Sequence, residues 1–234
     1  MALGGGVRYL DSGWQTMVDA LAARLDVRRL QAVAVQDDGG RVAVTTAGGP
    51  VIVGATAVVA TGTPAAAAGL LGRAPFECGP VIEASCLDLG VRRAAPRPFL
   101  LGVDRPLYLS THHPPAQLAP LGHQVVSLMR YLAPGERPSP AEVRAELTEH
   151  AHCAGIADDD IVASRALHRM VVCGALATVE HGGMAGRVPV TGAGVPGVLL
   201  TGDWVGGEGH LLDAGLASAR RAAELALARV PAAA

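Results

Sequence analysis

The chain has 234 residues, of which 50% are hydrophobic and 17% charged, and its formal net charge is −2. A chain of this length can bury the core of one large domain or two small ones. The near-neutral charge and the lack of a basic patch with interleaved aromatic residues argue against nucleic-acid binding. No apolar run approaches the roughly 20 residues of a transmembrane helix. Residues 1–6 lack the charged and apolar regions of a signal peptide, so we expect a cytoplasmic protein without a transmembrane segment.

The absence of lysine and the spacing of the cysteines limit the catalytic and metal-binding chemistry that the chain can perform. All 19 basic residues are arginine, which excludes a lysine as base, Schiff-base former or water-holding group. The four cysteines are widely spaced and contain no C-x-x-C pair. We therefore expect buried free thiols at Cys78, Cys86, Cys153 and Cys173, rather than disulfides or metal ligands.

The N-terminal third begins with a predicted helix. Apolar residues at 17, 18, 21 and 25 follow helical spacing over Thr16–Leu25, with Ser12 as the expected N-cap. Three short strands separated by Asp- and Gly-rich turns then predict a β-meander: Gln31–Gln36, Arg41–Thr46 and Pro50–Val53.

A buried strand, a tight turn and a helix come next. The strand is expected over Ala57–Thr61 and the helix over Ala65–Leu71, with Gly62 in the turn between them. This order is typical of a parallel sheet.

The middle of the chain has a different pattern of predicted helices and strands. It contains a predicted helix, Pro140–Cys153, with Ser139 as its cap and proline at its first position. The remaining extended segments predict a mixed or antiparallel sheet: Val81–Leu89, Phe99–Val103, Leu107–Ser110, His123–Tyr131 and Ser164–Val179.

The most informative segment lies near the C-terminus. The apolar strand Val198–Thr201 ends in Gly202-Asp203, a glycine-rich turn continues to Gly209, and a helix of small residues begins near Leu211. This order gathers a carboxylate and free backbone N–H groups at one sheet edge. It suits a bound polyhydroxylated, partly anionic cofactor.

These elements are interleaved along the chain. Residues 5–72 and 190–230 have α/β character, and residues 73–189 form a sheet-rich lobe between them. We therefore predict an α/β fold, in which a partial Rossmann-like domain is interleaved with an α+β lobe.

Five segments carry a resemblance to a known superfamily. They are 13–21 (GWQTMVDAL), 57–64 (AVVATGTP), 86–91 (CLDLGV), 118–123 (LAPLGH) and 198–209 (VLLTGDWVGGEG). In this order they resemble motifs of the flavin-dependent amine oxidase, phytoene desaturase and protoporphyrinogen oxidase superfamily. The last segment resembles its closing FAD-binding motif most closely.

The resemblance implies a cofactor, FAD, and roles for particular residues. Asp203 takes the place of the aspartate that hydrogen-bonds hydroxyls of the ribityl or pyrophosphate region, within a motif that also includes Gly202, Trp204 and Gly209. The helix that begins near Leu211 directs its N-terminus toward the flavin pyrimidine ring, where negative charge gathers on reduction. Gly62 lets the backbone approach the cofactor. From the residues alone, Asp203 also reads as a turn or capping aspartate, and Gly62 as a turn residue with positive φ.

One family element does not occur in this sequence. No G-x-G-x-x-G fingerprint is present, so two apolar strands are expected to have unpaired edges. The chain resembles the C-terminal portion of a flavoprotein: a truncated gene product, the result of a misplaced start codon, or one subunit of a split enzyme. The expected partners are an N-terminal flavoprotein polypeptide or a second copy of the chain.

Several histidines and one arginine are the remaining candidates for catalytic or ligand-binding residues. His210 lies beside the Gly-Asp turn and is the catalytic candidate, while His112 or His113 could transfer protons in the sheet-rich lobe. His150 and His152 point to different helix faces, so we predict no metal site. Arg187 precedes the final strand and is a candidate to approach the flavin.

The sequence thus supports two hypotheses. The first is an FAD-dependent oxidoreductase that transfers hydride from a small apolar organic substrate to flavin. The missing lysine favours desaturase-like chemistry over that of many amine oxidases. The second is a catalytically incompetent fragment, or an interaction subunit that needs an N-terminal partner.

Overall fold

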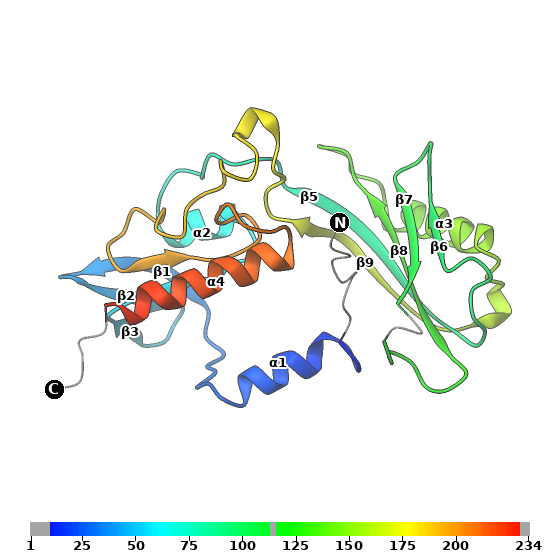
Figure 1. The fold of residues 1–234 in the computed structure, drawn as a ribbon, viewed down its shortest axis with the longest axis horizontal. Helices are drawn as coiled ribbons and strands as arrows, with labels where there is room; N and C mark the ends of the chain where they lie inside the picture. The colour runs from blue at the N-terminus through cyan, green and yellow to red at the C-terminus, as the bar shows by residue number, and fades with distance from the viewer. Residues whose placement is uncertain (1–9, 113–115, 230–234) are drawn as a thin grey trace, which may run out of the picture. The chain divides into compact units, whose positions relative to one another are not determined.

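The computed structural model describes residues 10–112 and 116–229 (Figure 1). The chain forms two compact units, each built from two separate stretches. We call Arg29–Ile82 with Val171–Ala234 the Gly-Asp unit, and Met1–Arg28 with Glu83–Met170 the five-stranded unit. Because the chain leaves the Gly-Asp unit after Ile82 and returns to it at Val171, the interleaving expected from the sequence is present.

The Gly-Asp unit begins with the predicted β-meander. Strands β1 (Ala32–Asp38), β2 (Arg41–Thr46) and β3 (Val51–Gly54) pair antiparallel in chain order. The first hairpin turns through Gly39 and Gly40, which both have positive φ, and the Asp37 carboxylate accepts a hydrogen bond from the Gly40 N–H. These are the residues that tight hairpin turns require.

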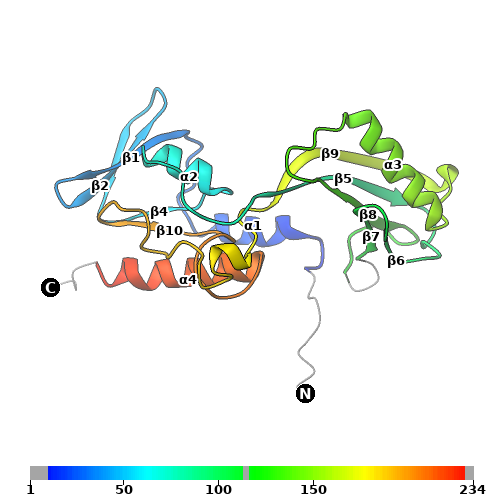
Figure 2. The same ribbon diagram turned by 90° about the horizontal axis from the view of Figure 1, so that it is seen from above.

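A two-stranded parallel sheet lies at the centre of this unit. Strand β4 (Ala57–Val59) pairs with β10 (Val198–Leu200), so segments 140 residues apart in the sequence become neighbours. Figure 2 shows helix α4 (Leu212–Leu227) on one side of the pair, and α2 (Pro64–Leu70) with the meander on the other. The predicted strand, turn and helix after residue 57 are confirmed, and Thr63 caps α2 through its hydroxyl.

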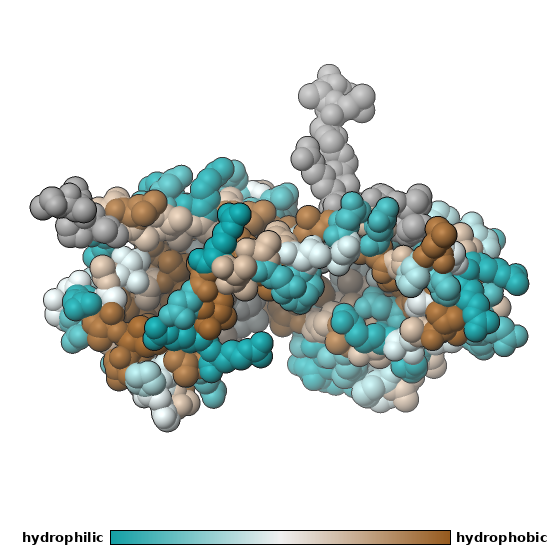
Figure 3. Space-filling model, turned by 90° about the horizontal axis from the view of Figure 1, so that it is seen from below, coloured by the Kyte–Doolittle hydropathy of each residue, from teal (hydrophilic) through white to brown (hydrophobic). Residues whose placement is uncertain are grey.

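The core of the Gly-Asp unit gathers around β10. All three β10 residues are buried, and α4 faces them with Ala214, Ser218 and Ala222. These small side chains allow the helix to approach the sheet closely. Figure 3 shows hydrophobic surface on one face of this unit. Large hydrophobic side chains of the unit are exposed at Val33, Val51, Ile52, Val53, Val58, Leu211, Leu212, Leu216 and Leu227.

The five-stranded unit contains the sheet predicted for the middle of the chain. Its strands lie in the order β6-β7-β8-β5-β9, and α3 (Pro140–Cys153) packs against β7 and β8. A capping box of Ser139 and Glu142 starts α3 at the predicted residue. The strand bounds are β5 Ile82–Val91, β6 Phe99–Leu101, β7 Leu107–Thr111, β8 Gln124–Tyr131 and β9 Ile161–Cys173.

Two predictions at element ends are wrong. Helix α1 (Trp14–Ala22) has Gly13, not Ser12, as its N-cap; Ser12 adopts a positive φ of 62° in the turn before it, and no side chain caps the helix. The extended segment expected to reach Val179 ends with β9 at Cys173, and short 3₁₀ turns occupy Asp158–Asp160 and Val179–His181. Over the described residues, no helix is long and apolar enough to cross a membrane.

The four cysteines are free, as predicted, but only Cys86 is buried; Cys78 and Cys173 are half-buried and Cys153 is exposed. Burial, and secondly the negative charge of Asp88, raises the pKa of the Cys86 thiol to about 11.

Alkylation should therefore distinguish the four thiols. Only thiolates react, so iodoacetamide at about pH 8 should modify Cys153 first and Cys86 last. The Cys86 rate should keep rising as the pH increases from 9 toward 11. Peptide mass spectrometry of the native chain measures both rates, and rapid modification of Cys86 at about pH 8 would contradict the structure.

Candidate functional site

The Gly-Asp turn is tied to the helix that follows it. Gly202 has a φ of +152°, and a Cβ there would lie 2.7 Å from Trp204 Nε1. Its N–H donates to Ser218 Oγ over 3.1 Å, and that hydroxyl lies 3.2 Å from the Gly202 carbonyl oxygen. Because Ser218 belongs to α4, one hydroxyl joins the end of β10 to the helix behind it.

Asp203 connects the same turn to the end of β9. Its Oδ2 accepts a 2.7 Å hydrogen bond from the buried N–H of Gly174. A Cβ on Gly174 would lie 2.5 Å from Asp203 Oδ1, 3.0 Å from Trp204 Cδ1 and 3.2 Å from the Gly62 carbonyl oxygen. The turn after β4, the end of β9 and the end of β10 therefore converge at Asp203. The sequence analysis missed Gly174, although a glycine directly after a long strand signals close backbone approach.

Trp204 lies inside the protein. Its side chain is 0% exposed, its ring centroid lies 5.3 Å from that of Phe76, and Nε1 is 3.5 Å from the Thr61 carbonyl oxygen. A ring in this position cannot present a face to a ligand. The indole instead supports the turn that carries Gly62, and a cofactor contact at Trp204 stays a prediction.

Gly62 is exposed and has neither a conformational nor a steric requirement for glycine. It does not have the positive φ that the turn interpretation needs, and an added Cβ would meet nothing within 4 Å. The open space beside it borders the convergence of Gly174 and Asp203. A molecule bound in this space would explain why position 62 is a glycine, which has no side chain.

The thiol of Cys173 lies in the same neighbourhood. Burial raises its pKa most, and the carboxylate of Asp203 raises it further. The thiol is therefore kept protonated, and the negative charge at this point belongs to Asp203.

The N-terminus of α4 begins in a strained turn. Leu211, its N-cap, has a φ of 49°, a conformation that costs a non-glycine residue about 1–3 kcal/mol, and no described side chain caps the helix. Gly209 precedes it with a φ of 72°, and a Cβ there would lie 2.9 Å from the Ala214 nitrogen.

Arg187 contacts the turn that precedes α4. Its Nη1 donates to the Gly209 carbonyl oxygen over 2.9 Å, and its Nη2 lies 3.4 Å from Nδ1 of His210, whose side chain is exposed. Arg187 and His210 were both sequence candidates, and the structure brings them together.

The other histidine candidates named above do not belong to the Gly-Asp unit where the structure describes them. His112 and His150 belong to the five-stranded unit, His152 pairs with Asp158 at 2.9 Å, and His113 falls outside the described residues. No group of three or more metal-binding side chains occurs among the residues that the structure describes.

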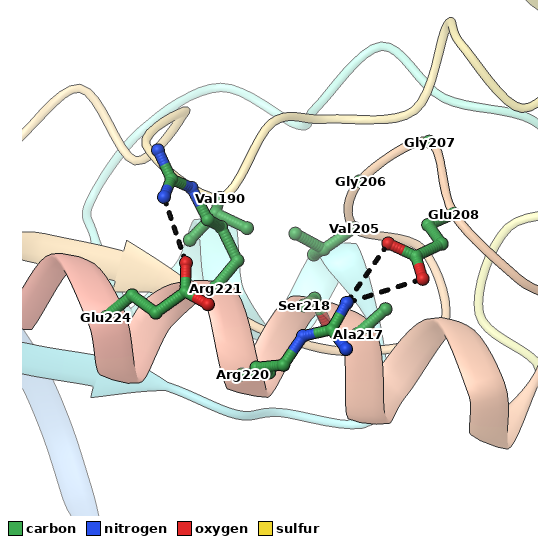
Figure 4. Close-up of a pocket in the computed structure, with 10 residues that line it drawn as sticks. All are labelled: Val190, Val205, Gly206, Gly207, Glu208, Ala217, Ser218, Arg220, Arg221 and Glu224. Atoms are coloured by element: carbon green, nitrogen blue, oxygen red, sulfur yellow. Dashed lines mark hydrogen bonds and ion pairs between the residues drawn. The ribbon is translucent and has the colours of Figure 1, made fainter.

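A separate pocket of about 200 Å³ lies between α4 and the loop after the Gly-Asp turn (Figure 4). Two ion pairs occupy its rim, Arg220 with Glu208 at 3.4 Å and Arg221 with Glu224 at 3.0 Å. Because each arginine already has a carboxylate partner, this pocket has no net charge to offer a ligand. Its lining includes neither Asp203 nor Gly62.

The predicted cofactor residues fit the flavin end of FAD. Asp203 offers acceptor oxygens for hydroxyls, Gly62 leaves space, and the uncapped start of α4 offers N–H groups and a positive dipole end.

Comparisons with known proteins agree on the fold. No protein-family model matches the chain, and neither does any curated protein. A protoporphyrinogen oxidase-like protein from Exiguobacterium sp. 255-15 superposes with a TM-score of 0.68 and 15% identity, over 94% of this chain and 52% of the other. The chain therefore shares its fold with this structure.

Two further flavoenzyme structures match. A putrescine oxidase variant has a TM-score of 0.62 and 11% identity over 92% of this chain and 52% of the other. HpxO from Klebsiella pneumoniae, in complex with FAD, has a TM-score of 0.52 and 15% identity over 94% and 55%. All three structures share the fold of this chain. The chain spans about half the length of these structures.

Two glycine-to-alanine substitutions test the convergence at Asp203. Gly174→Ala should destabilise the chain by about 1–3 kcal/mol, because the new methyl group overlaps Asp203, Trp204 and Gly62. Gly215→Ala is the matched control: its Cβ on α4 meets nothing within 4 Å, so it should stabilise the helix by about 0.5–1 kcal/mol. Urea unfolding measures both, and equal effects would contradict the packing around Gly174.

Proposed function

We propose that the Gly-Asp unit binds the flavin end of FAD and that the chain forms part of an FAD-dependent oxidoreductase. The observation that carries this proposal is the convergence of Asp203, Gly174 and Gly62 beside open space, at the carboxyl ends of two parallel strands. Ligands of open α/β sheets bind at this edge. The shared fold with HpxO, which was solved with FAD, supports the same cofactor.

Each residue has a distinct part in the proposed site. Asp203 accepts hydrogen bonds from hydroxyls of the ribityl or pyrophosphate region, while the Gly174 N–H holds its carboxylate in place. Gly209 and Leu211 shape the turn that exposes the α4 N–H groups toward the pyrimidine ring. A bound flavin would supply the acceptor for a hydride from a C–H bond of the substrate.

The substrate in this proposal is a small apolar organic molecule. The chain has no lysine and only 3% aromatic residues, so it lacks both a lysine-held water and the aromatic cage that suits an amine cation. These features favour a phytoene desaturase-like dehydrogenation. Within this chemistry His210 is the candidate for proton transfer, because its exposed ring lies at the turn before α4.

Flavin binding by the purified chain tests the cofactor proposal. We expect a yellow protein, or one that quenches the fluorescence of added FAD. Asp203→Ala should weaken FAD binding by about tenfold or more, because it removes charge-assisted hydrogen bonds. Gly62→Val should also weaken binding, yet leave stability within about 0.5 kcal/mol of the parent, since its side chain enters open space.

The controls for this experiment are in the same chain. Gly215→Ala should bind FAD like the parent, because Gly215 has open space around it on α4. If Gly62→Val binds FAD normally, the open space beside Gly62 is not the cofactor site.

One observation favours the second candidate function, a fragment or interaction subunit that needs an N-terminal flavoprotein partner or a second copy. Among the described strands, β4 pairs only with β10, and its Val58 side chain is 48% exposed. A two-stranded sheet is marginal alone, and parallel sheets are normally covered on both faces. The unpaired edge of β4 therefore supports strand addition from a partner.

A proline at the β4 edge tests this alternative. Ala57 and Val59 direct their backbone groups to β10, so the N–H of Val58 faces the opposite edge. Val58→Pro should leave the β4–β10 pair intact while blocking the addition of a strand.

The measurement is co-purification with a separate polypeptide that supplies a G-x-G-x-x-G βαβ unit, followed by flavin content. The parent and Val58→Thr should form the coloured complex, and Val58→Pro should not. Equal complex formation by all three would argue against pairing at this edge.

A further inference from the structure

Arg187 is a buried positive charge without a negative partner. The residue is 8% exposed. Its guanidinium contacts only the Gly209 carbonyl oxygen and His210 Nδ1, and its Nε has no hydrogen-bond partner. Within residues 10–112 and 116–229, no carboxylate oxygen lies within 4 Å of it.

Two other arginines that are partly shielded from solvent have carboxylate partners. Arg130 has a side chain only 13% exposed and pairs with Glu136 and Glu146, each at 2.6 Å. Arg169 pairs with Glu83 at 3.2 Å. Removing a guanidinium from water costs several kcal/mol unless an anion compensates it. Arg187 is therefore the exception that requires an explanation.

The surroundings of Arg187 show where a compensating anion would bind. The guanidinium lies behind the turn from Gly209 to Leu211, at the N-terminus of α4. Arginine can only donate, so Nδ1 of His210 is the acceptor in this contact. Asp213 in the first turn of α4 partly offsets the helix dipole, and Arg187 adds a full positive charge beside the same turn.

The charges that act on the Cys173 thiol also place Arg187 near the proposed cofactor site. The pKa of the Cys173 thiol is raised first by burial and then by Asp203, while Arg187 lowers it. Asp203 and Arg187 thus act on the same thiol from within one unit of the fold.

We propose that Arg187 is an anion-binding residue whose counter-charge arrives with a ligand at the turn from Gly209 to Leu211. The ligand group is a compact or planar anion, either the pyrimidine ring of reduced FAD or an anionic group of a second molecule. The first source rests on the proposed function, and the second does not.

Phosphate binding by the apo chain tests the residue without any flavin. Inorganic phosphate should raise the thermal unfolding midpoint of the parent in a saturable way at constant ionic strength. Arg187→Gln keeps an amide donor for Gly209 but removes the charge, and it should weaken phosphate binding by about tenfold or more. Arg187→Lys keeps the charge and should weaken binding less. The matched control, Arg220→Gln, removes an exposed arginine of the same unit and should bind phosphate like the parent.

Three results would overturn the proposal: no saturable effect of phosphate on the parent, an Arg187→Gln variant that binds phosphate as the parent does, or an Arg220→Gln variant that loses binding equally. Should Arg187→Gln not fold, the parent titration and Arg187→Lys still decide, because a charge-retaining variant must keep the response.

Flavin then distinguishes the two sources of the anion. If the anion is reduced FAD, phosphate and FAD compete, and Arg187→Gln weakens the binding of reduced FAD more than that of oxidised FAD. If phosphate still binds the FAD-loaded chain, the anion belongs to a second ligand. A chain that binds phosphate through Arg187 but binds no FAD contradicts the proposed function and leaves the role of Arg187 intact.

Discussion

The hydrogen bond from the Gly174 N–H to the Asp203 carboxylate is the contact on which the candidate site depends. It joins the end of β9 to the end of β10. The turn after β4 approaches both, because the Gly62 carbonyl oxygen lies beside Gly174 and the Thr61 carbonyl oxygen accepts from Trp204 Nε1. The bond satisfies a buried backbone donor that has no place in a sheet ladder. A carboxylate held in this way has one oxygen engaged by the protein, and the other oxygen remains able to accept from a ligand.

Much of the fold could be predicted because its signals are local. The meander follows from Asp and Gly at its turns, and α3 begins where Ser139 and Glu142 form a capping box. The N-cap of α1 was misplaced because serine is a good cap in general. The chain instead makes its turn one residue later, where Gly13 adopts a φ of 82°.

The candidate site could be predicted only in part, because its contacts join distant segments. Asp203 and Gly62 were recognisable from motifs, but Gly174 lies 29 residues before its partner and has no motif of its own. Arg187 stood out by position, whereas its burial without a carboxylate partner depends on packing that periodicity does not reveal. Trp204 shows the converse: it belongs to the recognised motif, but its ring packs in the core against Phe76. Sequence identity of 11–15% to structures that share the fold is consistent with this division, since backbone topology tolerates substitutions that site geometry does not.

The length of β4 has a consequence for any strand that adds to it. In a three-residue strand whose first and last residues face β10, only Val58 directs its N–H and C=O toward the open edge. Two backbone hydrogen bonds contribute roughly 1 kcal/mol each, far below the roughly 4–15 kcal/mol that association of two separate molecules costs. The burial of apolar side chains beyond Val58 must therefore supply most of the free energy of association. Selectivity among incoming strands would then depend on the shape of their side chains, with backbone pairing setting only the register.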